Sequence, residues 1–272
     1  MLGKRNVWLF VLIAYSWSWL FWILAALIAR GLSVPSSIEG FLLGPLNPAA
    51  WGPLIAAFLT TYLDEGKTGV KKLLKRGVKY RFGKAWYLVI FLLFPALIGG
   101  AFLLAVLSGE PVTKLTALAN PISIPIAFAY IFFLGGPLQE EFGWRGYALE
   151  HLQTRFNAFV SSIIVGLIWG FWHLPLFLMP KQEFYYQRPI WELVLSTTLV
   201  AILFTWLYNN TRKSILAVLL FHTMFNLSHY VFPTLSSDRG SLYLLGLLLL
   251  AGILILILGI LGEKTSHLHN RW

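Results

Sequence analysis

Two neighbouring glutamates and an arginine, Glu140, Glu141 and Arg145, lie in an apolar stretch of the sequence. Each ionised group at bilayer depth costs about 2.5–3.5 kcal/mol on insertion scales, and adjacent carboxylates resist ionising together. Residues four apart share a helix face, so Glu141 and Arg145 are expected to form an ion pair that lowers this cost. Glu140 lies about 100° around the helix from Glu141. Glu140 is therefore the freer carboxylate and the candidate general base. The alternative is that both acids and the arginine form a structural clamp between helices, although an ion pair needs only one of the two carboxylates.

Histidines in two later apolar segments form the second group of candidate catalytic residues. His173 lies in one of them, and His222 and Asn226 lie four apart on one face of the other. His229 extends this face, and we interpret it as structural and nearer the membrane edge. A lone membrane histidine is often only a hydrogen-bonding group between helices. Two histidines, an aligned asparagine and a spare carboxylate together favour a catalytic site.

The elements that carry these residues are expected to be membrane helices. The chain has 272 residues, of which 58% are hydrophobic and 12% charged, and its mean hydropathy is +0.72. Soluble domains carry about 25% charged residues, so lipid must be the solvent. We predict an all-α, polytopic membrane helix bundle that forms a single domain over 1–272, with its catalytic motifs within 137–226. The eight candidate spans are 7–29, 46–63, 85–108, 121–149, 157–179, 190–208, 213–232 and 241–262.

Basic residues are distributed unevenly between the two sides of this topology. The net charge is +10, and eight of the 21 Lys and Arg residues lie in the single loop 67–84. With the N-terminus inside, 15 fall on the cytoplasmic side and five on the other, so both termini are expected to be cytoplasmic. Membrane lipid is the expected partner of this basic face, and nucleic acid is not, since there is no extramembrane domain to bind it.

Several familiar active sites are excluded by residue types. Cysteine is absent, which removes thiolate nucleophiles and thiolate metal sites. The sequence has no His-Glu-x-x-His zinc helix and no Gly-x-Ser-x-Gly elbow. Its two aspartates, Asp64 and Asp238, both fall in predicted loops, so an aspartyl dyad in the membrane is excluded.

The blocks Glu140-Glu141-x-x-x-Arg145, Trp169-x-x-x-His173 and His222-x-x-x-Asn226 resemble the three motifs of the CPBP family of intramembrane glutamic endopeptidases. This family includes the CAAX prenyl protease of the Rce1 type and the bacterial Abi proteins. Trp169 stands where the family commonly has Phe, a departure that we expect to affect packing and not chemistry.

The resemblance implies a metal-independent peptidase that needs no cofactor. Glu140 and His173 would bind and activate a water, while His222 and Asn226 would stabilise the oxyanion. Glu141 and Arg145 would hold the site. The substrate would be a protein or peptide, in the best-known branch a prenylated C-terminal Cys-a-a-X tail. A basic cytoplasmic face and an apolar cavity would suit such a tail.

Three alternatives stay open. Glu140, His173 and His222 could be three ligands of a zinc-dependent membrane protease. The chain could instead be a non-catalytic membrane scaffold or immunity factor, or a proton-coupled transporter, although it lacks the repeats typical of transporters.

A further question concerns the depth of the two residues in the membrane, because His173 lies farther along its span from the cytoplasmic side than Glu140 does. Their meeting requires helix tilt, a deeply set turn between the fourth and fifth spans, or a break at Gly135-Gly136-Pro137.

Overall fold

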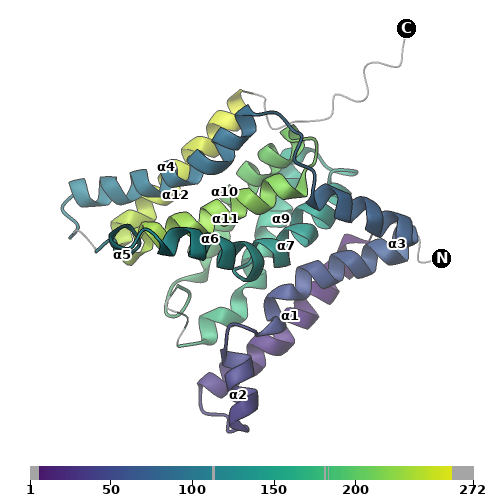
Figure 1. The fold of residues 1–272 in the computed structure, drawn as a ribbon, viewed down its shortest axis with the longest axis horizontal. Coiled ribbons are helices and arrows are strands. Elements are labelled where there is room, and N and C mark those ends of the chain that lie inside the picture. Colours follow the sequence, from purple (N-terminus) through teal and green to yellow (C-terminus); the bar gives the residue numbers. More distant parts are fainter. Residues whose placement is uncertain (1–5, 112–113, 181, 183, 259–272) are drawn as a thin grey trace.

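The computed structural model describes residues 6–111, 114–180, 182 and 184–258, and every regular element among them is helical (Figure 1). In chain order the elements are α1 (Val7–Ala29), α2 (Ser36–Leu43), η1 (Pro48–Trp51), α3 (Gly52–Gly77), α4 (Ala85–Leu107), α5 (Thr116–Ala119), α6 (Ser123–Leu134), α7 (Pro137–Gly143), η2 (Trp144–Leu149), α8 (Glu150–Leu152), α9 (Ala158–Trp172), η3 (Leu174–Leu178), α10 (Ile190–Asn210), α11 (Ile215–Val231), η4 (Thr234–Ser236) and α12 (Asp238–Ile257). The predicted all-α fold is confirmed.

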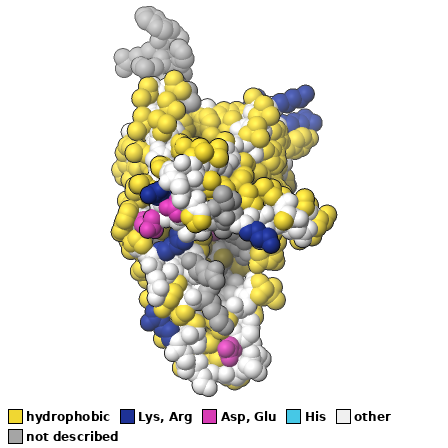
Figure 2. Space-filling model, turned by 90° about the vertical axis from the view of Figure 1, so that its left-hand side faces the viewer, with side chains coloured by type: hydrophobic (Ala, Val, Ile, Leu, Met, Phe, Trp, Pro, Cys, Tyr) yellow, Lys and Arg dark blue, Asp and Glu magenta, His cyan; other side chains and the backbone are white. Residues whose placement is uncertain are grey.

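Membrane-spanning helices are also confirmed, but they are less uniform than eight equal spans. Five helical segments of the described chain are long and apolar enough to cross a bilayer: Val7–Ala29, Ala85–Leu107, Ala158–Leu178, Ile190–Asn210 and Asp238–Ile257. A sixth candidate is the pair formed by α2 and the helix after it, which is bent by 51°. Helices α6 and α11 are apolar but shorter. Hydrophobic side chains cover much of the face shown in Figure 2, as contact with lipid requires.

The predicted span 121–149 is wrong as one continuous helix. Helix α6 ends at Leu134, and α7 begins at Pro137 after two glycines. Gly136 has φ 113°, a left-handed conformation that glycine adopts without steric cost. Pro137 follows at the first helical position, where its missing N–H has no helical partner to lose.

Helix α3 extends well beyond the predicted span 46–63 and folds back at Gly66, where φ is 62° and ψ is −156°. A straight helix of 26 residues would be about 39 Å long, too long for both ends to reach one short helix. Both ends do reach α7. A methyl group on Gly143 would come within 2.6 Å of Pro53, and one on Gly77 would come within 2.5 Å of the Phe142 ring. The basic second half of α3 therefore packs back against the helix that carries the glutamates.

One end of the bundle, which we call the basic end, is formed by 67–84, 150–157 and 211–214. The Ser214 hydroxyl donates to the Lys79 carbonyl at 2.6 Å, and the Lys79 ammonium donates to the Arg212 carbonyl at 2.8 Å. These contacts tie the connection before α4 to the connection between α10 and α11.

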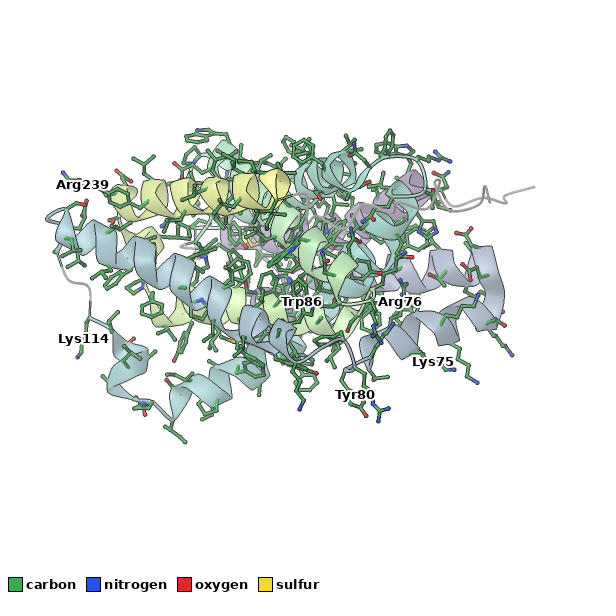
Figure 3. The ribbon with its side chains drawn as sticks, turned by 90° about the horizontal axis from the view of Figure 1, so that it is seen from above. Lys75, Arg76, Tyr80, Trp86, Lys114 and Arg239 are labelled. Carbon is green, nitrogen blue, oxygen red and sulfur yellow. The ribbon has the colours of Figure 1, made fainter. Side chains whose placement is uncertain are left out.

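The opposite end, the far end, is formed by 30–47, 108–122, 173–189 and 232–241. Arg30 donates to the Leu178 carbonyl at 2.9 Å, which joins the end of α1 to the end of η3. Arg239 donates to the Ser108 carbonyl, so α12 begins where α4 ends. Figure 3 shows Lys75, Arg76 and Tyr80 well separated from Lys114 and Arg239. Residues 1–5 and 259–272 lie outside the described chain, so the cytoplasmic position of both termini stays a prediction.

Candidate active site

The break between α6 and α7 sets the position of the first glutamate. The backbone N–H of Gly136 donates to the Gln139 side-chain oxygen at 3.0 Å, which caps the first turn of α7. On the other side of the break, the Asn226 amide donates to the Gly135 carbonyl at 2.9 Å. Helix tilt, a deeply set turn or a break at Gly135-Gly136-Pro137 could each bring Glu140 and His173 together. The structure contains the break. It places the first turn of α7 against α11.

Glu140 is buried and accepts hydrogen bonds from two indole N–H groups. Its Oε2 atom accepts from Trp169 Nε1 at 2.6 Å and from Trp144 Nε1 at 3.3 Å. Its other oxygen, Oε1, lies over Gly136, where a methyl group would come within 2.7 Å of it. The carboxylate is held from one side, and it borders two cavities.

The structure corrects the expectation that Trp169 matters only for packing. The indole N–H of Trp169 makes the shorter of the two hydrogen bonds to the Glu140 carboxylate. A phenylalanine ring at this position has no donor to offer. The aromatic residue that departs from the family pattern therefore contacts the candidate general base directly.

Glu141 has a different set of partners. Its Oε1 atom accepts from Arg145 at 2.8 Å and contacts His222 Nδ1 at 2.8 Å. The ion pair predicted from the four-residue spacing is present, and both of its side chains are fully buried. The Arg145 guanidinium also lies over the rings of Trp169 and Phe204, at 4.6 and 4.1 Å from their centroids. These contacts anchor α7 to α10 and α11 through one charge cluster.

His173 is the C-cap of α9 and is almost fully buried. Its Nδ1 lies 2.8 Å from the Trp169 carbonyl oxygen. Because a carbonyl only accepts, Nδ1 must carry the proton, and Nε2 of the neutral ring is then an acceptor. The ring also stacks on Tyr185, with centroids 5.8 Å apart and planes at 18°. The tautomer and the orientation of His173 are therefore both fixed by neighbours.

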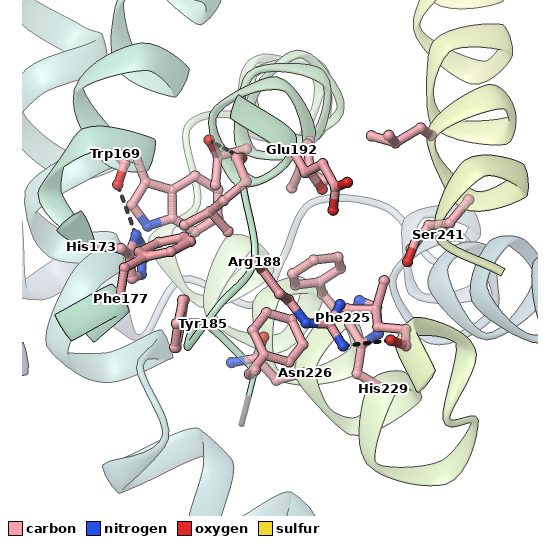
Figure 4. A pocket seen from close by; sticks show the side chains of 18 of the residues that line it. Trp169, His173, Phe177, Tyr185, Arg188, Glu192, Phe225, Asn226, His229 and Ser241 are labelled. Carbon is pink, nitrogen blue, oxygen red and sulfur yellow. Dashed lines mark hydrogen bonds between the residues drawn. The ribbon is translucent and has the colours of Figure 1, made fainter. Parts of the chain in front are cut away.

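Glu140 and His173 line two cavities. The first has a volume of about 360 Å³ and also contains His222 and Asn226 in its wall (Figure 4). His229 lines it too, packed edge-on against Phe225 with ring centroids 4.9 Å apart. The second has a volume of about 320 Å³, and its wall includes Trp22, Leu42, Gly136, Gln139, Trp172, Leu176 and Tyr185.

The structure thus brings the four predicted catalytic residues Glu140, His173, His222 and Asn226 to one cavity, with Glu141 and Arg145 behind them. Their chemical roles remain a prediction. Sequence reasoning missed four neighbours of the site: Gln139, Trp144, Trp169 as a hydrogen-bond donor, and Tyr185. The four-residue spacing from Glu140 was a usable signal for Trp144, since such residues share a helix face.

A third cavity, of about 900 Å³, lies at the basic end and contains none of the predicted catalytic residues. Within the described residues, no three His, Asp or Glu side chains gather as metal ligands. The sequence allowed Glu140, His173 and His222 as three zinc ligands. The structure does not arrange these three side chains as a metal site.

Comparison with known proteins identifies relatives of the region that carries the site. Residues 122–228 match the family described as "Type II CAAX prenyl endopeptidase Rce1-like", and this range contains all three motif blocks. The protein called "CAAX prenyl protease 2" of Methanococcus maripaludis is 34% identical over 147 residues, which cover 52% of this chain and 54% of the relative. The match therefore spans about half the length of the curated relative.

Proposed function

From the premise that this chain carries an Rce1-like region over residues 122–228, we propose that it is an endopeptidase that hydrolyses a peptide bond in or beside the membrane without a metal ion. The observation that carries the proposal is the convergence of Glu140 and His173 in one cavity among apolar helices. A carboxylate and an imidazole that face a common space can bind and polarise one water.

The reaction proceeds in two steps. Glu140 removes a proton from the water as its oxygen attacks the substrate carbonyl, and the carbonyl electrons move onto the oxygen as an oxyanion. Glu140 then returns the proton to the amide nitrogen, the C–N bond breaks and the carbonyl re-forms. His173 orients the water through Nε2, the free acceptor of its ring.

His222 and Asn226 stabilise the oxyanion. For His222 this role requires a particular protonation state of the ring. His222 already uses Nδ1 to contact the Glu141 carboxylate, so its Nε2 can donate to an oxyanion only when the ring is doubly protonated. The buried Glu141 carboxylate accepts from this Nδ1 and fixes the orientation of the ring. Glu141 and Arg145 thereby support the electrostatics of the reaction from behind the cavity.

The name of the archaeal relative suggests the first substrate to test, a prenylated C-terminal Cys-a-a-X peptide. Aromatic and aliphatic side chains form much of the two cavity walls, which suits apolar residues on either side of the scissile bond. Prenylation itself is a separate property that the assay must vary.

The test compares purified wild type with Glu140→Gln in detergent, using a fluorogenic farnesylated Cys-a-a-X peptide with and without a zinc chelator. We expect wild type to cleave in both conditions and Glu140→Gln to lose cleavage while keeping its thermal unfolding temperature. Glu39→Gln, an exposed glutamate of α2 outside all three cavities, is the matched control and should keep wild-type activity.

Other outcomes separate the alternatives. Inhibition of wild type by the chelator would favour the zinc-dependent protease. Full cleavage by Glu140→Gln would overturn the mechanism. A cellular function that survives Glu140→Gln, combined with no cleavage of any peptide by wild type, would favour the non-catalytic scaffold.

A further inference from the structure

The third cavity, of about 900 Å³ at the basic end, has an excess of positive charge in its wall. The wall is formed by the second half of α3, the turn after α8, and the connection between α10 and α11. Among its described residues, five cationic side chains face two anionic ones: Lys72, Arg76, Lys79, Arg212 and Lys213 against Glu65 and Glu150. A cleft lined mainly by one sign of charge concentrates ions of the opposite sign. This cavity therefore favours an anionic ligand.

The two glutamates have cationic partners inside the cavity. Glu150 contacts Lys213 at 2.6 Å and Arg76 at 3.5 Å. Glu65 contacts Lys72 at 3.2 Å, and both of these side chains are exposed. Exposed ion pairs contribute little stability, so Lys72 can leave this partner for a ligand.

Two further cations of the wall have no acidic partner within the described chain. The Lys79 ammonium donates one hydrogen bond, to the Arg212 carbonyl at 2.8 Å, and keeps two N–H groups for other acceptors. The Arg212 guanidinium has neither a hydrogen bond nor an ion pair with any described residue. Lys79 and Arg212 therefore present unmatched donors at one side of the cavity.

The backbone that carries Arg212 has an uncommon conformation. Arg212 and Lys213 have φ values of 55° and 61°, in the left-handed region that side chains other than glycine rarely adopt. The Lys213 N–H donates to the Tyr208 carbonyl at 2.9 Å, which helps to hold this turn. Residues kept in such conformations are concentrated at ligand-binding sites. The turn thus fixes two consecutive cations beside the cavity.

Exposed apolar side chains lie next to these cations. Val78 and Tyr80 flank Lys79 in the sequence, and Phe156 forms part of the cavity wall. All three side chains are exposed in the structure. Figure 3 shows Tyr80 at the same end of the bundle as Arg76. A ligand that combines an anionic group with an apolar chain can use both kinds of contact, whereas a free anion uses only the first.

We propose that the third cavity binds the phosphate group of an anionic phospholipid. The guanidinium of Arg212 offers paired N–H donors that match two oxygens of a phosphate, and the ammonium of Lys79 adds a compact positive charge. Basic cavities between membrane helices bind phospholipid headgroups through such contacts. The cavity contains none of the proposed catalytic residues, so this inference is independent of the proposed peptidase function. It also holds for either orientation of the basic end in the membrane.

The test measures lipid binding to the purified full-length protein in a neutral detergent by native mass spectrometry. The probes are a short-chain phosphatidylglycerol, the zwitterionic phosphatidylcholine of the same chain length, and inorganic phosphate. The test variant combines Lys72→Gln with Arg212→Gln, two cavity residues without buried ion pairs. The matched control combines Lys75→Gln with Arg81→Gln, which removes the same two residue types from exposed positions of the basic end outside the cavity.

We expect wild type to bind phosphatidylglycerol saturably and in preference to phosphatidylcholine, and the control variant to bind it equally well. Each Lys or Arg beside an anionic headgroup strengthens binding about fivefold, so the Kd of the test variant should rise about twenty- to thirtyfold. The single variant Arg212→Gln should raise the Kd about fivefold, and it serves as the test if the double variant has a lower Tm than wild type.

Three results would overturn the proposal. Equal weakening in the test and control variants would show that the basic end attracts lipid as a whole and not through this cavity. Equal binding of the two lipids, or no saturable binding of either, would show that the cavity does not select an anionic headgroup. Binding of inorganic phosphate that is lost in the test variant, without binding of phosphatidylglycerol, would assign the cavity to a soluble phosphate. None of these measurements requires catalysis, so failure of the peptidase assay would leave their result unchanged.

Discussion

Glu140 and Glu141 are adjacent in α7, but their carboxylates lie in different environments. Within the described part of the chain, Glu140 accepts hydrogen bonds from two neutral indole N–H groups and borders two cavities. Glu141 is fully buried, and one of its oxygens contacts both Arg145 and His222. In the proposed reaction the first carboxylate exchanges a proton, whereas the second is held by Arg145 and His222. A pair of equivalent acids, as in a shared-proton dyad, would need similar surroundings.

Removing Arg145 should destabilise the fold strongly. Arg145→Met leaves the Glu141 carboxylate buried beside His222 alone, and breaking a buried pair costs about 3–5 kcal/mol. The double variant Arg145→Met with Glu141→Gln removes both charges and should recover part of this loss. The measurement is the apparent Tm of each variant in detergent. Strictly additive losses would show that the two side chains are not energetically coupled.

Trp169→Phe should weaken catalysis without unfolding the protein. It removes the 2.6 Å hydrogen bond to Glu140, and such bonds to charged groups contribute about 1.5–3 kcal/mol. If that contribution holds the carboxylate in its reactive orientation, kcat/KM should fall about ten- to hundredfold. Trp144→Phe removes the longer 3.3 Å bond and should have the smaller effect. Equal activity of Trp169→Phe and wild type would mean that the indole only fills space.

The spacing of residues along the sequence predicted the contacts and faces that lie within a single helix. The Glu141–Arg145 ion pair follows from a four-residue step, and the placement of His222 and Asn226 on one face follows from another. The membrane fold follows from composition, because so much apolar surface requires lipid. These inferences needed no knowledge of how helices pack.

The parts that the sequence could not predict depend on long-range packing. Trp169 and Glu140 are 29 residues apart, and their contact exists only because the fold packs α9 against η2, the element that follows α7. Gly66 gave no sign that α3 would fold back there, since an isolated glycine is tolerated in many helices.

Gly136→Ala should impair the site by a steric route. The residue has φ 113°, which is strained for any side chain, and the added methyl group would lie 2.7 Å from Glu140 Oε1. We expect a lower apparent Tm and a loss of cleavage, because the carboxylate must move. Gly246→Ala in α12 is the control, since its added methyl group would meet no atom within 4 Å. Alanine at this control position should leave the Tm unchanged or raise it slightly, by its higher helix propensity. An active, fully stable Gly136→Ala would show that the break tolerates a side chain.

Glu150 should make the basic end sensitive to acid. Burial raises the pKa of its carboxyl, but the Lys213 ammonium at 2.6 Å and the Arg76 guanidinium at 3.5 Å outweigh burial and hold the pKa below its ordinary value of 4.5. The unfolded chain then binds the proton more readily than the folded one, so stability rises with pH in this range. The contribution is fully present above pH 4.5 and is lost as the pH falls through the lower folded value.

The check on Glu150 is the apparent Tm of wild type and Glu150→Gln between pH 3 and pH 7 in detergent, scanned in steps of about half a unit. We expect Glu150→Gln to unfold at a lower temperature than wild type at pH 7, because Arg76 and Lys213 lose their anionic partner. The two curves should converge as the pH falls, since protonation gives wild type the same neutral group. Glu39→Gln, at an exposed position without an ion pair in the described chain, should follow wild type at every pH. Parallel curves for wild type and Glu150→Gln would show that the carboxylate of Glu150 does not titrate with folding, and that its contacts at the basic end contribute no charge-dependent stability.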